Sequence, residues 1–372
     1  MLIRLAILGL DPVQREWLTA VDALRVAGEI DLVGVGHRSL ALAKDVADQF
    51  QNMTGQQGSL LHSGKSGGRG DRPAAFDDLR LLLKDTAPQV LLMDRPSNVG
   101  IDFILACVNQ DIGVLSLGPP VENVAEAQAL ADVLTPRTHL LYVWPRLADA
   151  FAFRHCTQAE EFVRPIRFAS ATWLGMNHAL AKTAGAKGAG GGGNRADMSV
   201  RSLSVLAWDA LATLIDLFGI PATVYASIRG TVGSGDTFHD ISGACALTLR
   251  FEGESGGGVA SVTLSDRVPG AGRRELLLLG QGGTVKLEPD AYEFRDVDGK
   301  LIDAGRAGEK EGNGSRAMDT LKEFLRHFSQ APSPARGWDH RLHDIAATME
   351  ALVVSHRTGQ AESPERFRQL RR

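Results

Sequence analysis

One short turn near the N-terminus carries residue types that either bind a phosphate or exclude it. An apolar run leads into the stretch Gly9-Leu10-Asp11-Pro12-Val13-Gln14, and a helical pattern follows. A dinucleotide-binding turn needs Gly-x-Gly-x-x-Gly here, because the backbone must approach a pyrophosphate at the helix N-terminus. Only Gly9 of that pattern is present. Asp11 instead fits an N-cap, Pro12 the first helical position and Gln14 the third, which together resemble a capping box.

The charge of Asp11 separates two interpretations of this turn. Two unit charges about 4 Å apart interact by roughly 4 kcal/mol at an effective dielectric near 20. That repulsion corresponds to about a thousandfold loss of affinity for a pyrophosphate. Asp11 either caps its own helix and occupies the anion-binding position, or it rotates into water and leaves the position open.

A second candidate contact follows the second apolar run, at Gly36-His37-Arg38-Ser39. An acidic residue near this point commonly binds the ribose hydroxyls of NAD, whereas a basic residue accommodates the 2′-phosphate of NADP. His37 and Arg38 therefore favour NADP over NAD for any bound dinucleotide. The alternative is that Arg38 is only a solvated residue at a helix start.

Length and composition define the class of protein that must position these residues. With 372 residues, the chain is long enough for about two domains. Its 40 basic and 44 acidic residues give a net charge of −4, which argues against nucleic acid as the main partner. The sequence contains no apolar run of membrane-spanning length. The three cysteines are far apart and odd in number, which indicates a reducing, cytoplasmic compartment.

The first part of the chain alternates short apolar runs with helical patterns. We expect strands at Ile3–Leu8, Leu32–Val35, Val90–Met93 and Gly113–Leu115, and helices at 12–27, 39–50, 76–84 and 98–109. This alternation is typical of βαβ units and a parallel sheet. Residues 52–72 are rich in Gly, Ser and Gln and are expected to form a surface loop. We therefore predict a Rossmann-type domain over residues 1–122.

The rest of the chain has strand-like alternation around one apolar helix. Strands are expected at 163–174, 222–229, 241–251, 258–265, 274–279 and 284–296, and the helix ends at Gly219. Helical patterns at 316–328 and 339–357 follow. The prediction is an α+β domain over 123–358, with a large, open-faced, mostly antiparallel sheet. Residues 359–372 are expected to be a frayed basic tail.

The order of these elements resembles that of the Gfo/Idh/MocA oxidoreductases over roughly residues 2–360. The resemblance rests on the opening strand-turn-helix, the strand ending in Arg95-Pro96, the turn Gly118-Pro119-Pro120 and the C-terminal sheet. It implies a Rossmann domain for NAD or NADP, hydride transfer to or from sugars and polyols, and homo-oligomers formed through the open sheet. No metal is implied. The cofactor-binding residues that it implies are Gly9, Leu10, Asp11, Pro12, His37, Arg38, Arg95, Pro96, Asn98 and Gly118.

The catalytic positions that the resemblance implies are occupied by unusual residues. Gly118 stands where the family has a lysine, and glycine supplies no cation to polarise a hydroxyl. Counting back from Gly219, Asp209 stands where the family has a histidine base, and Ala212 where it has an aspartate. Asp209 is the catalytic candidate if it is buried. The alternative is that Asp209, with Thr213 and Asp216, lies on a solvated helix face.

Other side chains have weaker chemical interpretations. His340 and His343 share a helix face and could hold a metal, although an exposed amphipathic helix explains the pair better. Trp144, Trp173 and Trp208 could line a sugar groove or could pack in the core. Cys156 beside His155 could be a nucleophile, and a core thiol is the simpler interpretation.

Three hypotheses follow for function. The first is a family homologue that binds a sugar-like small molecule or a partner protein but has lost ordinary hydride transfer. The second is an active NAD(P)-dependent oxidoreductase that uses Asp209 or an arginine-assisted site. The third is a lyase or hydrolase with a trapped dinucleotide. Neither nucleic acid nor a membrane is an expected partner.

Overall fold

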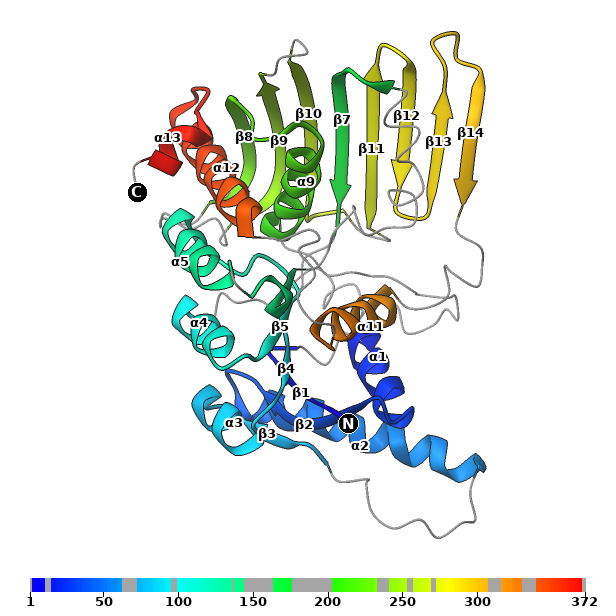
Figure 1. The fold of residues 1–372 in the computed structure, drawn as a ribbon, viewed down its shortest axis with the longest axis vertical. Coiled ribbons are helices and arrows are strands. Elements are labelled where there is room, and N and C mark those ends of the chain that lie inside the picture. Colours follow the sequence, from blue (N-terminus) through cyan, green and yellow to red (C-terminus); the bar gives the residue numbers. More distant parts are fainter. Residues whose placement is uncertain are drawn as a thin grey trace. The chain divides into compact units, whose positions relative to one another are not determined.

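The computed structural model describes residues 2–10, 15–61, 72–94, 99–135, 137–143, 163–175, 203–232, 241–252, 257–268, 272–306, 316–329 and 339–369. The chain divides into two compact units (Figure 1). The first contains residues 1–120, 132–144 and 314–338, and the second contains residues 121–131, 145–313 and 339–372. The sequence placed one boundary near residue 122. The units differ from that division because 132–144 and 314–338 return to the first unit.

A six-stranded parallel sheet forms the centre of the first unit, in the order β3-β2-β1-β4-β5-β6. Its strands are β1 (Ile3–Leu8), β2 (Ile30–Gly36), β3 (Ala74–Phe76), β4 (Val90–Met93), β5 (Gly113–Ser116) and β6 (Leu141–Val143). The predicted parallel sheet is therefore confirmed. β3 and β6 were not predicted, since a three-residue strand is too short to show alternation.

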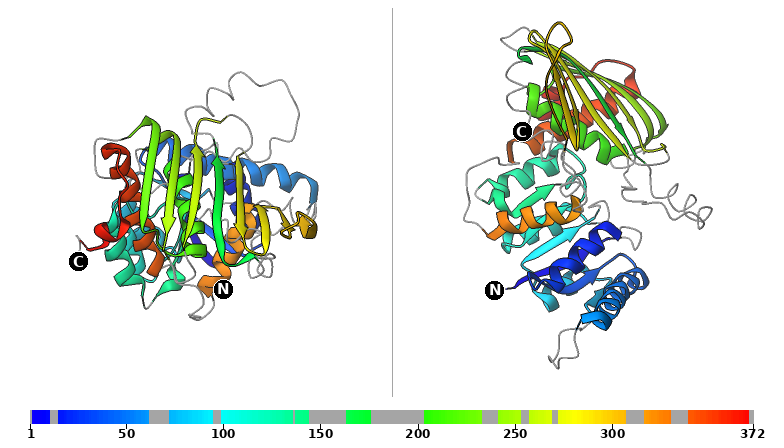
Figure 2. Two further views of the ribbon diagram at one scale, coloured as in Figure 1. Left: turned by 90° about the horizontal axis from the view of Figure 1, so that it is seen from above. Right: turned by 90° about the vertical axis from the view of Figure 1, so that its right-hand side faces the viewer.

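Helices flank this sheet on both sides (Figures 1 and 2). They are α1 (Arg15–Val26), α2 (Leu40–Leu61), α3 (Leu79–Thr86), α4 (Ile101–Asn109) and α11 (Arg316–Ser329), while α5 (Val124–Leu134) and a 3₁₀ turn (Thr138–Leu140) lie between β5 and β6 in the chain. Helix α2 corrects the loop predicted from residue 52, because it continues to Leu61. Once a helix is nucleated, each added residue needs little further ordering, which offsets the low propensity of Gly55 and Gly58.

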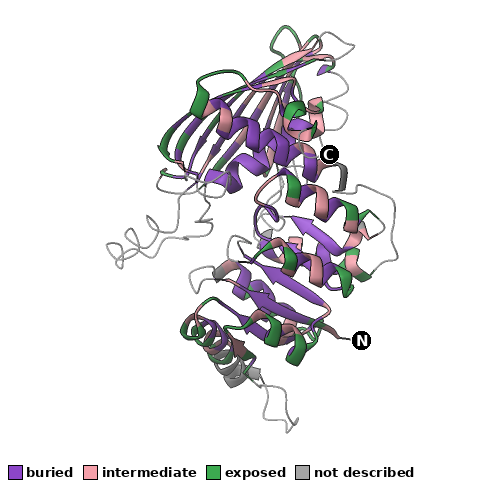
Figure 3. Cartoon of the chain, turned by 90° about the vertical axis from the view of Figure 1, so that its left-hand side faces the viewer, coloured by how far each residue is buried: buried purple, intermediate pink, exposed green. Residues whose placement is uncertain are grey.

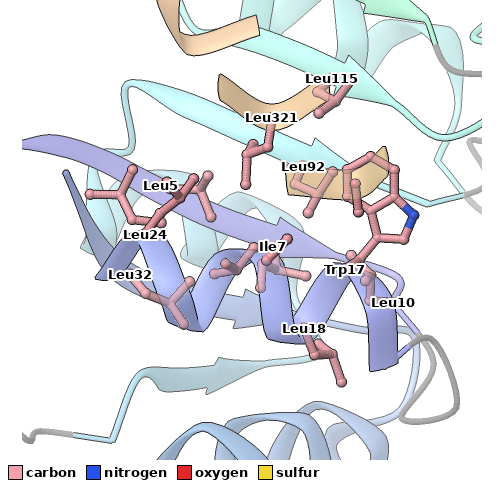
Figure 4. Close-up of a cluster of buried hydrophobic side chains, with 14 of the residues drawn as sticks. Leu5, Ile7, Leu10, Trp17, Leu18, Leu24, Leu32, Leu92, Leu115 and Leu321 are labelled. Carbon is pink, nitrogen blue, oxygen red and sulfur yellow. The ribbon is translucent and has the colours of Figure 1, made fainter. Parts of the chain in front are cut away.

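One apolar cluster holds the first unit together. Leu5 and Ile7 of β1, Leu92 of β4 and Leu321 of α11 are fully buried. Figure 4 shows these side chains converging between α1, the strands and α11. Burying one such side chain stabilises the fold by roughly 1.5–3 kcal/mol. This cluster fixes the position of the strand ends that carry the candidate dinucleotide turn.

The second unit contains an eight-stranded sheet in the order β14-β13-β12-β11-β7-β10-β9-β8. Only β7 and β10 run parallel; the other neighbours are antiparallel, which confirms a mostly antiparallel sheet. The strands are β7 (Ile166–Leu174), β8 (Thr223–Thr231), β9 (Ser242–Phe251), β10 (Gly258–Ser265), β11 (Arg273–Gly280), β12 (Gly283–Glu288), β13 (Ala291–Arg295) and β14 (Leu301–Arg306). The predicted strand 284–296 is instead a hairpin of β12 and β13, and β14 was not predicted.

Two helices pack on one face of this sheet (Figure 3). On the other face, the alternate residues of β8, β9 and β10 are mostly exposed, and those of β7, β11 and β12 are mostly half-buried. Helix α9 (Leu203–Phe218) packs on β7, β9 and β10, and α12 (Asp339–Thr358) packs on β8 and on α9. Because α9 has neighbours on more than one side, every residue from Leu203 to Ile215 is buried. The solvated helix face suggested for Asp209 and Thr213 is therefore wrong, since both are buried.

The alternation of β9 separates the two faces as predicted. Cys245, Leu247, Leu249 and Phe251 are buried, and Ala244, Ala246, Thr248 and Arg250 are exposed.

The C-terminal segment is attached to the edge of the sheet at β8, where Val224 and Glu362 exchange two backbone hydrogen bonds. Helix α13 (Pro364–Gln369) follows, and Arg368 pairs with Asp344 at 3.3 Å. The C-terminal segment is therefore docked along 360–369, which corrects the predicted frayed tail. In the part of the chain described, no helix has the length and apolar character needed to cross a membrane.

Candidate functional site

The candidate dinucleotide turn begins at a residue that must be glycine. Gly9 has φ +75°, and its N–H donates to the Gly36 carbonyl at 2.9 Å. A Cβ at Gly9 would lie 2.6 Å from the backbone oxygen of Asp94, which is closer than atoms of a side chain approach. Gly9 therefore lets the carboxyl ends of β1, β2 and β4 meet, as a dinucleotide fold requires. Leu10, the next predicted contact, has its side chain in the hydrophobic core.

The rest of that predicted turn lies outside the described residues. This applies to Asp11 and Pro12, and also to Arg95, Pro96 and Asn98 after β4. The choice between a capped helix end and an open pyrophosphate position at Asp11 therefore stays a prediction.

His37 lies at the carboxyl end of β2 and is held by the backbone. Its N–H donates to the Phe76 carbonyl at 2.9 Å, and its Nδ1 accepts from the Ser39 N–H at 3.2 Å. Because Nδ1 is the acceptor, the neutral ring carries its proton on Nε2. His37 is buried and Arg38 is exposed. The end of β2 therefore carries a buried imidazole followed by an exposed cation.

Gly118, which the resemblance places at the family's lysine position, is part of a tight turn after β5. Gly118 has φ +155°, in a region that side-chain-bearing residues rarely adopt. Its carbonyl accepts from the Ser116 Oγ at 2.8 Å. A lysine at Gly118 would therefore strain this turn.

A groove of about 1100 Å³ runs between α3 and α4 of the first unit. Leu83, Val99 and Phe103 form apolar walls, and Asp77 and Asp102 lie among its polar lining residues. The groove is thus lined by both apolar and charged side chains. Sequence reasoning missed it, because a groove depends on the spacing of two helices and not on a local motif.

The second unit places Asp209 in a buried polar cluster. Its Oδ2 accepts from the Trp173 Nε1 at 2.8 Å and from the Arg274 Nη1 at 3.1 Å. Asp209 is fully buried and 8% of Arg274 is exposed. Trp173 of β7 and Arg274 of β11 are cross-strand partners, so the sheet register brings both to one carboxylate. Sequence reasoning identified Asp209 but missed Arg274, since no spacing connects them.

The remaining candidates lie mostly in the interior. Ala212, which the sequence analysis placed at the family's aspartate position, is buried, as are Trp173 and Trp208. His343 is also buried, which corrects the exposed helix face expected for it; the His340 side chain, Trp144 and Cys156 lie outside the described part. The described residues contain no group of three metal-ligating side chains.

Two cysteines are chemically inert in this fold. Burial raises the pKa of the Cys107 thiol and of the Cys245 thiol to about 12. Because the thiolate is the reactive form, neither is a nucleophile near neutral pH. The described thiols therefore contribute packing and no chemistry.

Comparisons with known proteins identify the fold. No family model and no curated protein match the sequence. An oxidoreductase from Thermotoga maritima is similar in structure, with a TM-score of 0.68, 16% identity, and coverage of 99% of this chain and 100% of that one. An oxidoreductase from Agrobacterium radiobacter, solved with NAD⁺, L-tartaric acid and magnesium, has a TM-score of 0.68 at 13% identity, covering 98% and 99%.

A third similar structure is the WlbA dehydrogenase from Bordetella pertussis, in complex with NADH and UDP-GlcNAcA. Its TM-score is 0.63 at 13% identity, covering 98% of this chain and 99% of that one. Structural similarity at sequence identities this low establishes the fold, and function must be argued from the residues of the site. The protein has the fold of the Gfo/Idh/MocA-type oxidoreductases.

Proposed function

We propose that the protein binds a sugar-like small molecule on this fold without catalysing ordinary NAD(P)-dependent hydride transfer, and that it serves as a binding or assembly protein. The observation that carries the proposal is the state of Asp209. The residue in the position of the family's base is fully buried, and one of its oxygens already accepts two hydrogen bonds.

The chemistry of alcohol oxidation explains why this matters. A general base must come within hydrogen-bond reach of the hydroxyl whose proton it removes. The Asp209 Oδ2 faces Trp173 and the Arg274 guanidinium, which stays protonated and cannot relay a proton. The second requirement is a cation to stabilise the developing alkoxide. Gly118 supplies none, so neither of these two positions offers a side chain suited to its role.

The coenzyme is a separate part of this proposal. His37 and Arg38 support NADP over NAD, and similar structures contain NAD⁺ or NADH. Asp11 argues against a pyrophosphate if it caps its helix. We expect weak binding of both nucleotides, with NADPH bound more tightly than NADH.

An active oxidoreductase with rearranged catalytic residues is the second candidate. The observation in its favour is Gly9, whose close approach to Asp94 keeps the backbone geometry that a dinucleotide needs. If this candidate holds, Asp209 or an arginine-assisted site performs the proton transfer.

Calorimetric titration and turnover assays separate the two candidates. The purified protein is titrated with NADPH and NADH at low salt, and reduction of NADP⁺ and NAD⁺ is followed across aldoses and polyols. Micromolar coenzyme binding with turnover contradicts our proposal. Tighter NADPH binding by D11G, with no turnover in either protein, supports it and identifies the carboxylate as the obstacle.

We further propose a cytoplasmic homo-oligomer formed through the exposed face of the eight-stranded sheet. That face carries small and polar side chains such as Ala246 and Thr263. Light scattering after size exclusion measures the mass. The T263R variant is expected to reduce it, and E29R, an exposed change in the other unit, is the control. A wild-type monomer contradicts this part.

A further inference from the structure

The Arg274 guanidinium is only partly used by the fold. Among the described residues, its side chain hydrogen-bonds Asp209 alone, through Nη1. A guanidinium carries five N–H donors in a planar fork, and buried donors are almost always paired. With 8% of the residue exposed, the remaining donors have access to solvent. A polar ligand group can therefore reach them.

Asp209 holds that guanidinium in place. Its Oδ2 also accepts from the Trp173 Nε1, and Trp173 is itself fully buried. The hydrogen bond from Trp173 of β7 thus holds the carboxylate in place, and the carboxylate in turn holds Arg274 of β11. A preorganised arginine loses little side-chain freedom on binding a ligand, which favours recognition.

From this geometry we infer that Arg274 recognises the carboxylate of a sugar acid, and that Asp209 is the positioning residue that aims it. The inference rests on the proposed function and names its ligand class. A carboxylate matches two parallel N–H groups of the fork, and such charge-assisted pairs are stronger than hydroxyl contacts. Asp209 already places one negative charge beside Arg274, which favours a monoanion over a phosphate dianion.

The test uses three ligands that share one ring. D-Glucuronate, D-glucose and glucose 6-phosphate present a carboxylate, a neutral hydroxymethyl group and a dianion at the same carbon. Isothermal titration of the full-length protein is expected to give at least tenfold tighter binding of glucuronate than of either other compound. Equal binding of glucose and glucuronate, or no binding of glucuronate, overturns the inference.

Variants assign the preference to Arg274. R274K keeps the charge but loses the fork, and glucuronate affinity is expected to fall about tenfold. R341K is the matched control, because Arg341 pairs with Asp216 of the same helix α9. The double variant D209N/R274M removes both charges and keeps an acceptor for Trp173, so it is expected to fold and to lose the preference. Unchanged glucuronate binding in either Arg274 variant contradicts the assignment.

The outcome is distinguishable from that of the proposed function. Glucuronate oxidation with NADP⁺ or NAD⁺ in the same cuvette would contradict the proposed absence of hydride transfer while leaving the role of Arg274 intact. Conversely, neutral sugars that bind as tightly as glucuronate, without turnover, would leave the proposed function intact and remove the inference.

Discussion

The two units differ at the positions that the sequence analysis singled out, Gly9 in the first unit and Asp209 in the second. In the first unit, the place where a dinucleotide turn begins keeps a tight backbone approach, with Gly9 against Asp94. In the second unit, the position where the resemblance predicts a base holds a buried ion pair between Asp209 and Arg274. The close backbone approach after β1 depends on a single glycine. Proton transfer instead needs several side chains within hydrogen-bond reach of one another.

The largest expected effect tests the second unit. D209A leaves the Arg274 charge buried without its partner, and such a loss destabilises a fold by about 3–5 kcal/mol. Urea unfolding measures it. D216A is the control, because the Asp216–Arg341 pair is more exposed and should cost much less. A stability of D209A equal to wild type would show that Asp209 does not anchor this unit.

The next effect tests the first unit. Alanine at Gly9 must adopt a positive φ and approach the Asp94 oxygen, so we expect a loss of about 1–3 kcal/mol and weaker coenzyme binding. G28A is the matched control variant, because Gly28 also has a positive φ, of +73°, but no atom lies within 4 Å of an added Cβ. Thermal denaturation and calorimetry compare the two variants. Equal losses in both would assign the effect to φ alone and not to the close approach.

The cysteines allow each unit to be followed separately. Cys107 lies in the first unit and Cys245 in the second, and burial raises both thiol pKa values to about 12. In a C156S background, both are expected to resist a thiol reagent at pH 8 until their unit opens. G9A should expose Cys107 first and D209A should expose Cys245 first. Simultaneous labelling in both variants would contradict independent opening.

The same thiols give a pH dependence with a definite sign. A raised thiol pKa stabilises the fold fully below the ordinary thiol pKa, and this contribution is lost as pH rises toward about 12. Unfolding free energy should therefore decline above about pH 9. Replacing Cys245 with alanine should reduce that slope.

The smallest effect lies on the exposed sheet face. Hydrogen bonding from Arg273 lowers the pKa of Glu275, so its contribution is present above the ordinary carboxyl pKa and lost as pH falls through the lowered value. Because Arg273 is exposed and Glu275 is only half-buried, E275Q should reduce stability only slightly, and about 1 M salt should remove most of the difference. A salt-independent loss would contradict a purely electrostatic role.

Much of the fold was predictable, because its signals are local. Ile3–Leu8, Val90–Met93 and the alternation of β9 follow from side-chain periods within single segments. The hairpin at β12 and β13 was missed because its strands are short and close together. The extension of α2 was missed because glycine-rich composition outweighed helix propagation in the prediction.

The sequence by itself determined the parallel and antiparallel halves, the need for glycine after β1, and the unusual residues at positions 118, 209 and 212. Only the tertiary structure decided what Asp209 does. Its partners Trp173 and Arg274 lie 36 and 65 positions away in the chain and meet it through the sheet register and the packing of α9. Burial and charge pairing are properties of that assembled environment, and no spacing within one segment encodes them.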